Sequence, residues 1–365
     1  MSALIQTYIS HVKSTMMRWS KNILEADLGE EPRQDQEGRL WSPAPVDYFR
    51  MVNEQVALVK GTSRGPLLLR SGRAVVSSIY AFQEGLEALV KAPLESLSLE
   101  RLAAAVNNCA RCDELVRELG EEVNGALDET VEARLSVEKA SIGFVNLAEL
   151  ASRRVVDFVF GDPAVTELFD KLFTGEPWES GDVTSSVVAT LRDYMGDVQA
   201  YLRRDFFKVA ARECLERTVN LYFQKFAAHV PAVTPGTLSR MDADADAIGD
   251  YFGELLRASK VEEWAQRVRD LRDLAGEDNV ESFVISFTTL IRNGAAVPVG
   301  LAERLLSSRE GLTRQERKEA LAQCREMVDT HFSAMDAREG LEEVHQKLEP
   351  ARRTGRLWRR AKSSV

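Results

Sequence analysis

The sequence contains few of the residues that hold metals, form disulfides or interrupt helices. It has 4 cysteines and 4 histidines in 365 residues, with only 22 glycines and 11 prolines. No apolar stretch approaches the roughly 18 residues of a membrane-spanning helix. The first one, residues 3–12 (ALIQTYISHV), is too short and too interrupted for a secretory signal. We therefore expect a reduced, cytoplasmic protein whose thiols pack as apolar side chains.

Positive charge is also scarce in the body of the chain. The 57 acidic residues outnumber the 47 basic ones, which gives a formal net charge of −10. Binding to a phosphate backbone requires many Lys and Arg side chains. We therefore do not expect the body of the protein to bind nucleic acid.

The sequence lacks the short motifs that identify common catalytic and cofactor sites. It has no HExxH, no phosphate-binding GxxxxGK[ST] and no dinucleotide fingerprint, and its GxSxG match, residues 61–65 (GTSRG), follows a predicted helix instead of the strand that a nucleophile elbow requires. We expect no catalytic residue, no cofactor and no metal, and we interpret the chain as a scaffold or binding module. A helical enzyme or lipid-transfer protein with an internal cavity is the alternative from another class.

Two short motifs have both a chemical and a structural interpretation. Cys109 and Cys112 form a CxxC, but Cys214, Cys324 and the scattered histidines supply no second pair of zinc ligands. Residues 242–246 (DADAD) resemble the start of a calcium loop, yet its sixth and twelfth places hold Ala247 and Gly253. We expect helix packing for the first motif and an acidic helix N-terminus for the second.

Apolar residues recur every three or four positions almost throughout, which predicts an all-α fold with no significant β-sheet. Helices are expected at about 3–27, 65–91, 99–127 and 131–160, with one short helix within 161–182. Residues 183–229 contain no proline and a single glycine, so we predict one helix there, on the order of 70 Å long. This length favours an elongated rod of stacked helical bundles.

Residues 230–236 (VPAVTPG) are the sharpest break in the chain, and we place a domain boundary there. The predicted domains are a first helical bundle with long helices (1–232), a second helical bundle (233–345) and a basic C-terminal tail (346–365). Shorter helices are expected in the second bundle, one of them over residues 281–291 (ESFVISFTTLI).

The stretch 41–59 (WSPAPVDYFRMVNEQVALV) predicts a helix that begins near Pro45. Asp47 falls in its first turn, where a negative charge suits the helix dipole. Phe49 belongs to the apolar face, whereas the polar residues Asn53 and Gln55 are not needed for a plain core helix. The acidic segment that leads into this helix predicts an exposed loop.

The C-terminal tail is basic, whereas the body of the chain is acidic. Its basic residues, with one tryptophan among them, are Arg352, Arg353, Arg356, Arg359, Arg360, Lys362 and Trp358. Such a cluster can hold anionic lipid headgroups. A solvated tail, a basic helix end set against its own dipole and a nuclear-import signal remain alternatives.

Several blocks, taken in order, resemble the C-terminal half of the exocyst subunit Sec-six, from near the first residue to about residue 325. These blocks are RWSKNILEAD (18–27), APVDYFRMVNEQV (44–56), LAAAVNNCARCDELVREL (102–119), VFGDPAVTELFDKLFTGEPW (159–178), ATLRDYMGDVQAYL (189–202), DADAIGDYF (244–252) and LLSSREGLTRQERKEAL (305–321). Tyr48 departs from the family, which tends to have leucine there. The family's chain is longer and has an N-terminal coiled region, so a fragment and a short relative both remain open.

The resemblance implies a vesicle-tethering protein of the helical-rod type that catalyses no reaction. It implies a cytoplasmic location, peripheral at plasma-membrane sites of exocytosis, where secretory vesicles dock. The implied partners are other exocyst subunits, SNARE proteins and their Sec/Munc regulators, with anionic phospholipid contact through the tail. A short Sec-six-like protein acting on membrane protrusions and actin, or a helical lipid-binding protein, remains an alternative.

The resemblance also implies structural roles for the residues of these blocks. Their signature positions are Pro45, Asp47, Phe49, Asn53, Gln55, Asn107, Asn108, Asp193, Tyr194 and Asp197. We expect them at helix starts and helix–helix seams, with Asn53, Gln55, Asn107 and Asn108 satisfying the backbone or neighbouring helices.

Overall fold

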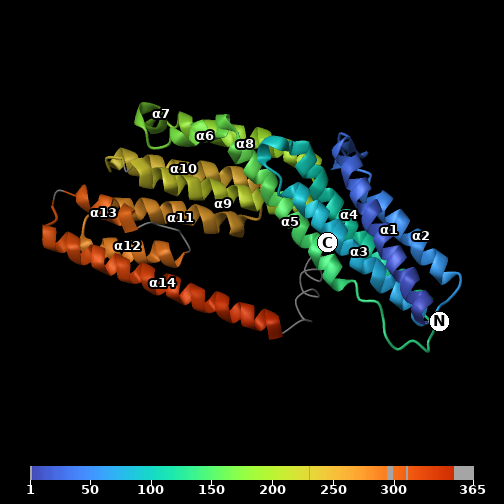
Figure 1. Cartoon of the computed structure of the whole chain (residues 1–365). Coiled ribbons are helices and arrows are strands. Elements are labelled where there is room, and N and C mark those ends of the chain that lie inside the picture. Colours follow the sequence, from blue (N-terminus) through green and yellow to red (C-terminus); the bar gives the residue numbers. More distant parts are fainter. Residues whose placement is uncertain (1, 230, 294–298, 310, 349–365) are drawn as a thin grey trace. The chain divides into compact units, whose positions relative to one another are not determined.

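The computed structural model describes residues 2–229, 231–293, 299–309 and 311–348. This part of the chain contains fourteen α-helices and one two-stranded antiparallel sheet of two residues per strand (Figure 1). The all-α prediction is therefore confirmed. None of the described helices is long and apolar enough to span a membrane.

The chain divides into two compact units that take turns along the sequence. The first comprises Met1–Asp170, Val183–Thr218 and Asp250–Val261, and the second comprises Lys171–Asp182, Val219–Gly249 and Glu262–Val365. The boundary expected at residues 230–236 lies inside a segment of the second unit.

The bounds of the elements in the first unit are as follows: α1 (Ser2–Leu28), β1 (Arg33–Gln34), β2 (Leu40–Trp41), α2 (Ala44–Lys60), α3 (Pro66–Val90), the 3₁₀-helix η1 (Leu94–Ser96), α4 (Leu99–Ala126), α5 (Glu138–Gly161) and α6 (Pro163–Asp170). Four further helices contribute residues to both units: α8 (Asp182–Tyr201), α9 (Arg204–His229), α10 (Pro235–Leu255) and α11 (Ala258–Gly276). The second unit also contains α7 (Gly175–Glu179), α12 (Val280–Arg292), α13 (Val299–Ser307) and α14 (Arg314–Leu348).

Local sequence explains where several helices begin. Pro45 lies in the first turn of α2, where a missing N–H costs nothing, and Asp47 follows it there. Ser98 caps α4 by accepting a hydrogen bond from the Arg101 amide at 3.2 Å. Asn279 caps α12 in the same way, accepting from the Ser282 amide at 2.8 Å. The helix predicted over residues 281–291 is thereby confirmed.

The first unit is built around α4 and α5, which pack on each other more extensively than any other pair. The helices α1, α2 and α3 pack on one another, and α2 also packs on α4. The Tyr48 ring stacks on Phe82 with 4.1 Å between centroids, and its hydroxyl donates to Ser78 Oγ at 3.2 Å. The tyrosine that departs from the family pattern is therefore a fully buried core residue.

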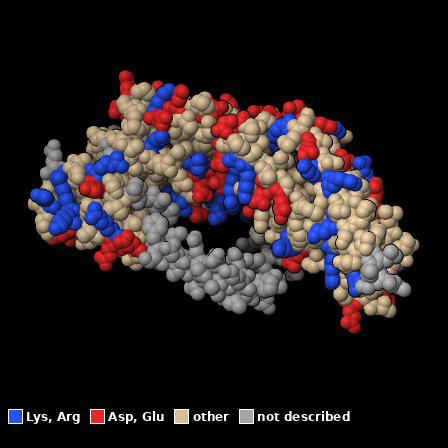
Figure 2. Space-filling model, in the orientation of Figure 1, with Lys and Arg blue, Asp and Glu red and all other residues tan. Residues whose placement is uncertain are grey.

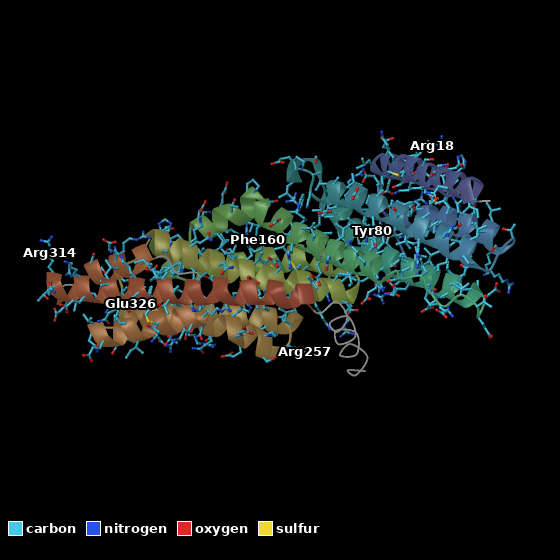
Figure 3. The ribbon with its side chains drawn as sticks, turned by 60° about the horizontal axis from the view of Figure 1, so that its bottom comes forward. Arg18, Tyr80, Phe160, Arg257, Arg314 and Glu326 are labelled. Atoms are coloured by element: carbon cyan, nitrogen blue, oxygen red, sulfur yellow. The ribbon has the colours of Figure 1, made fainter. Side chains whose placement is uncertain are left out.

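The second unit has an aromatic centre and a separate helical layer. Phe173, at a φ of 61°, contacts the rings of Trp178, Tyr222 and Phe226 at centroid distances of 4.7, 4.8 and 5.1 Å. Elsewhere in this unit, α12 and α13 pack on α14. Figure 3 labels Arg314 and Glu326 on α14, and Figure 2 shows acidic and basic side chains interspersed over the visible face.

Three sequence predictions about helix boundaries are wrong. The single helix expected over residues 183–229 is two helices, α8 and α9, separated by Leu202 and Arg203. The helix expected from residue 131 starts only at Glu138, because residues 127–137 form a connection between α4 and α5. The passage 161–182, for which one short helix is predicted, contains both α6 and α7.

Candidate functional site

Asn107 joins three segments of the first unit that are far apart in sequence. Its amide Nδ2 donates to the carbonyl oxygens of Leu40 at 2.7 Å and Tyr201 at 2.8 Å. Its Oδ1 accepts from the Arg203 amide at 3.1 Å. Tyr201 ends α8 and Arg203 precedes α9, so Asn107 bonds backbone groups that the helix break leaves without an intrahelical partner. The side chain thereby fixes the break that the sequence did not predict.

Asn108 makes a reciprocal pair with Ser42, which lies between β2 and α2. Its Nδ2 donates to Ser42 Oγ at 2.7 Å, and its Oδ1 accepts from the Ser42 amide at 3.0 Å. Both residues are buried. The two neighbouring asparagines of α4 thus hold the segment 40–42 on the bundle, which corrects the expectation of an exposed loop for this end of the connection.

The polar residues of α2 behave differently from those of α4. Asn53 is exposed and Gln55 is half-buried, because Val52, Val56 and Val59 occupy the inward face of α2. Among the described residues neither side chain has a hydrogen bond, so the expected bonding to backbone or neighbouring helices is wrong for both. The inward residue Phe49 is 1% exposed.

Asp193, Tyr194 and Asp197 follow one another on α8 but have different surroundings. Tyr194 donates its hydroxyl hydrogen to Asp162 Oδ2 at 2.5 Å, while Asp162 Oδ1 accepts from the Ala164 amide at 2.7 Å. This bond raises the pKa of Tyr194 to about 12 and holds the pKa of Asp162 below its usual range. Asp193 and Asp197 are exposed, so only the tyrosine of this block fastens α8 to the start of α6.

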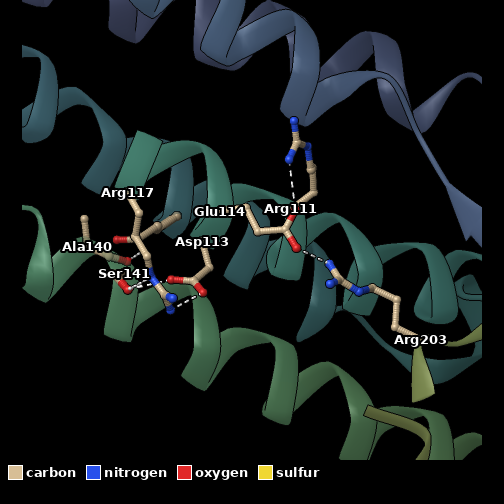
Figure 4. Close-up of polar contacts among 8 residues, drawn as sticks. Arg111, Asp113, Glu114, Arg117, Ala140, Ser141 and Arg203 are labelled. Atoms are coloured by element: carbon tan, nitrogen blue, oxygen red, sulfur yellow. Dashed lines mark hydrogen bonds and ion pairs between the residues drawn. The ribbon is translucent and has the colours of Figure 1, made fainter. Parts of the chain in front are cut away.

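Figure 4 shows two polar clusters, one between α4 and α5 and one between α4 and the helix break. The buried Asp113 accepts from Ser141 Oγ at 2.5 Å and pairs with the Arg117 guanidinium. Glu114 accepts from Arg111 at 2.9 Å and pairs with Arg203 at 2.7 Å. Burial opposes ionisation of Glu114, but the two guanidinium groups outweigh it and lower the pKa of the carboxyl. No motif indicates the Glu114 cluster, since Arg203 and Glu114 lie far apart in the sequence.

In the second unit, Asp244 is the centre of a buried polar cluster. The carboxylate is 0% exposed and accepts from Trp178 Nε1 at 2.9 Å, Tyr222 OH at 3.0 Å and Arg240 Nε at 3.0 Å. Burial, and then the charge of Asp244, raise the pKa of Tyr222 well above its ordinary value. Tyr222 therefore stays a neutral donor, and the cluster ties α7, α9 and α10 together.

The acidic run 242–246 is not a helix N-terminus, which corrects our expectation. It lies inside α10, which begins at Pro235, so its charges are beyond the first turn where the dipole acts. Asp242 pairs with Arg272 at 3.2 Å, and Asp246 pairs with Arg269 at 3.2 Å. Within this run, Asp242 and Asp246 point outward, and Asp244 between them points inward.

The four cysteines are free and buried. Burial raises the pKa of Cys109, Cys214 and Cys324 to about 12 and that of Cys112 well above its ordinary value. A thiolate is the form that attacks electrophiles or binds metals, so these thiols act as apolar packing groups. Among the described residues no group of His, Cys, Asp and Glu could hold a metal ion.

The basic tail residues predicted to bind membrane lie outside the described residues. The buried polar features described above are the two asparagines of α4, the Asp113 cluster and the Asp244 cluster. In each of them the polar side chains bond helices and connections to one another. This arrangement defines an all-helical bundle protein whose buried polar groups serve its own packing.

The comparison with protein families is consistent with that class. Residues 1–314 match the family described as Exocyst complex component Sec6, and the chain belongs to this family. It is the Sec-six family of the resemblance described above.

Two solved structures have the same fold. The crystal structure of the C-terminal domain of the exocyst subunit Sec6p aligns with a TM-score of 0.79 at 16% identity, covering 92% of this chain and 93% of that chain. The crystal structure of M-Sec aligns with a TM-score of 0.67 at 12% identity, covering 89% of this chain and 56% of that chain. At these identities the likeness is one of architecture.

Proposed function

We propose that this chain is a non-enzymatic vesicle-tethering subunit of the exocyst that docks secretory vesicles at the plasma membrane during exocytosis. The observation that supports this proposal is the match of residues 1–314 to the exocyst component family. The proposed partners are other exocyst subunits, SNARE proteins and Sec/Munc regulators, at plasma-membrane sites of exocytosis.

The physical basis of the proposal is which side chains the fold buries and which surfaces it leaves exposed. Nearly every helix buries apolar residues against its neighbours. The buried polar side chains of Asn107, Asn108 and Asp244 form hydrogen bonds that join helices and connections to one another. The outer faces of the helices remain available for partners. A scaffold that binds several partners at once raises their effective concentration for one another without new chemistry.

A pull-down from cytosol with the purified full chain tests this proposal. We expect other exocyst subunits to be enriched over beads that carry an unrelated helical protein, with SNARE proteins or Sec/Munc regulators among the bound material. The folded state of the bait is checked by circular dichroism before and after the incubation. Recovery of no exocyst subunit by a folded bait would contradict the proposal.

We make a separate proposal for the tail, namely that it contacts anionic lipid. Deleting residues 357–365 removes Trp358, Arg359, Arg360 and Lys362. At about 1 kcal/mol for each basic residue near an anionic surface, the deletion should lower flotation with phosphatidylserine-containing liposomes by roughly tenfold or more. A deletion of residues 363–365 keeps every basic residue and is the matched control. Equal flotation of the two deletion variants would remove the tail from membrane contact.

A further inference from the structure

Two segments of this acidic chain contain no acidic residue. Asp and Glu make up 57 of 365 residues, yet none occurs in residues 1–24 or in residues 55–83. The first segment forms most of α1, and the second contains the first 18 residues of α3. Their exposed basic residues on the two helices are Lys13, Arg18, Lys21, Arg70 and Arg73, and we call this set the α1–α3 basic face.

The two helices lie side by side, and one close approach fixes their register. A Cβ atom on Gly85 of α3 would lie 2.4 Å from Leu24 Cδ1 of α1, so a larger residue there would have to displace the Leu24 side chain. The helices α1 and α3 run parallel to each other, in the same direction along the chain (Figure 1). Counting back 11 residues from each partner at 1.5 Å per residue puts Lys13 level with Ala74. Lys13 and Arg73 are therefore within about one turn of each other along the helix axes.

Helical periodicity places these side chains on one outer surface. At about 100° per residue, Lys13 and Met17 lie within roughly 20° of the direction in which Leu24 points toward α3. Both are exposed, Met17 to 47%, so they line the outer edge of the α1–α3 seam. Arg70 lies about 60° from the direction of Gly85, on the exposed side of α3. Figure 3 shows Arg18 on the outer side of α1.

The cations of this face are less neutralised than Arg111 of α4, which belongs to the same unit. Among the described residues Lys13, Arg18, Arg70 and Arg73 have no ion pair, and Lys21 pairs with Glu25 at 3.6 Å. Glu84 is the other exposed acid on these two helices near the face. By contrast, Arg111 on α4 is bonded to both Glu114 and Glu118. The face therefore keeps a local positive potential on a chain of net charge −10.

We propose that the α1–α3 basic face binds the surface of a bilayer rich in anionic phospholipid. The face spans two packed helices, and four of its five Lys and Arg side chains have no ion pair among the described residues; the exposed Met17 lies among them. Long basic side chains reach headgroup phosphates while an apolar residue between them enters the headgroup–acyl boundary. An acidic protein helix would instead be favoured by an apolar groove for its anchor residues, whereas the large apolar side chains exposed on the described part of α1 are the separate residues Tyr8, Met17 and Leu28. This site is distinct from the tail and goes beyond the proposed tethering function.

Co-sedimentation with vesicles of phosphatidylcholine and phosphatidylserine tests the proposal. The full chain carries Gln at Arg352, Arg353, Arg356, Arg359 and Arg360 in every arm, so that the tail does not mask the effect. The face variant is Lys13→Gln, Arg70→Gln and Arg73→Gln. The matched control is Arg204→Gln, Lys208→Gln and Arg212→Gln, three exposed cations of α9 that also have no ion pair among the described residues. A Lys13→Arg, Arg70→Lys and Arg73→Lys variant retains the charge.

We expect the face variant to bind at least about tenfold more weakly than its parent, while the α9 control and the charge-retaining variant bind as the parent does. Added salt should weaken the parent's binding, because exposed charges are screened. No binding by the parent, an unchanged face variant, or an equal loss in the face variant and the α9 control would each overturn the proposal. Binding to polyglutamate but not to vesicles would overturn it in favour of an acidic protein partner.

Discussion

The substitution Asn107→Leu should lower the free energy of unfolding by about 4 kcal/mol. It removes three hydrogen bonds and leaves the carbonyls of Leu40 and Tyr201 and the amide of Arg203 without their side-chain partner. Each buried polar group left unsatisfied costs on the order of 1–3 kcal/mol. Leucine has the same number of side-chain heavy atoms as asparagine and the same branching, so the loss reports mainly on the polar bonds. Urea unfolding followed by circular dichroism measures it.

Asn53→Leu is the matched control for this experiment. It is the same substitution on a helix of the same unit, but the asparagine is exposed, so the change should stay within roughly 0.5 kcal/mol. An Asn107→Leu protein as stable as the control would show that water or a backbone shift replaces the lost bonds. In that case the bonds of Asn107 would not be what holds the break between α8 and α9.

Asp244→Ala should destabilise the second unit by about 4 kcal/mol, since removing one partner of a buried ion pair costs roughly 3–5 kcal/mol. The substitution leaves Arg240, whose side chain is 19% exposed, without the carboxylate at 3.0 Å. Trp178 and Tyr222 also lose their acceptor, and each is 1% exposed. Urea unfolding measures the loss, and proteolysis of the segment around α7 should become faster.

Asp246→Ala separates this effect from a general loss of negative charge. Asp246 is two residues away, its side chain is 67% exposed, and it pairs with Arg269 at the surface. Exposed pairs contribute about 0–1 kcal/mol, so this variant should unfold close to the parent. Similar losses in both variants would mean that the Asp244 cluster adds nothing beyond an ordinary surface pair.

Periodicity alone predicted the all-α fold and most helices, because each buries one apolar face. It could not predict the break at Leu202 and Arg203, since neither residue is a helix breaker and the apolar spacing continues through them. The break depends on Asn107, more than 90 positions before it in the chain. A helix can be interrupted where tertiary hydrogen bonds replace the intrahelical ones, and a local pattern does not record such a replacement.

The polar signature residues show the same limit of prediction from a local sequence pattern. Asn53 and Asn107 both occupy helices with an apolar stripe, and the sequence suggested one role for both. Only the helix rotation relative to its neighbours decides that Asn107 is buried and Asn53 exposed. The Asp242–Asp246 run is likewise predicted to be an acidic helix N-terminus, but α10 begins at Pro235, so the run lies beyond the reach of the helix dipole.

The alternation of the two units along the chain has a consequence for deletion mapping. A fragment that stops at residue 232 would lack Asp250–Val261, which belong to the first unit, and would retain Lys171–Asp182 and residues 219–232 without the rest of the second. The complementary fragment, residues 233–365, would keep Asp250–Val261 of the first unit and lack Lys171–Asp182 of the second. Loss of a binding partner after such a cut would therefore reflect a damaged fold as readily as a missing surface. Point substitutions on intact protein are the sounder way to locate where partners bind.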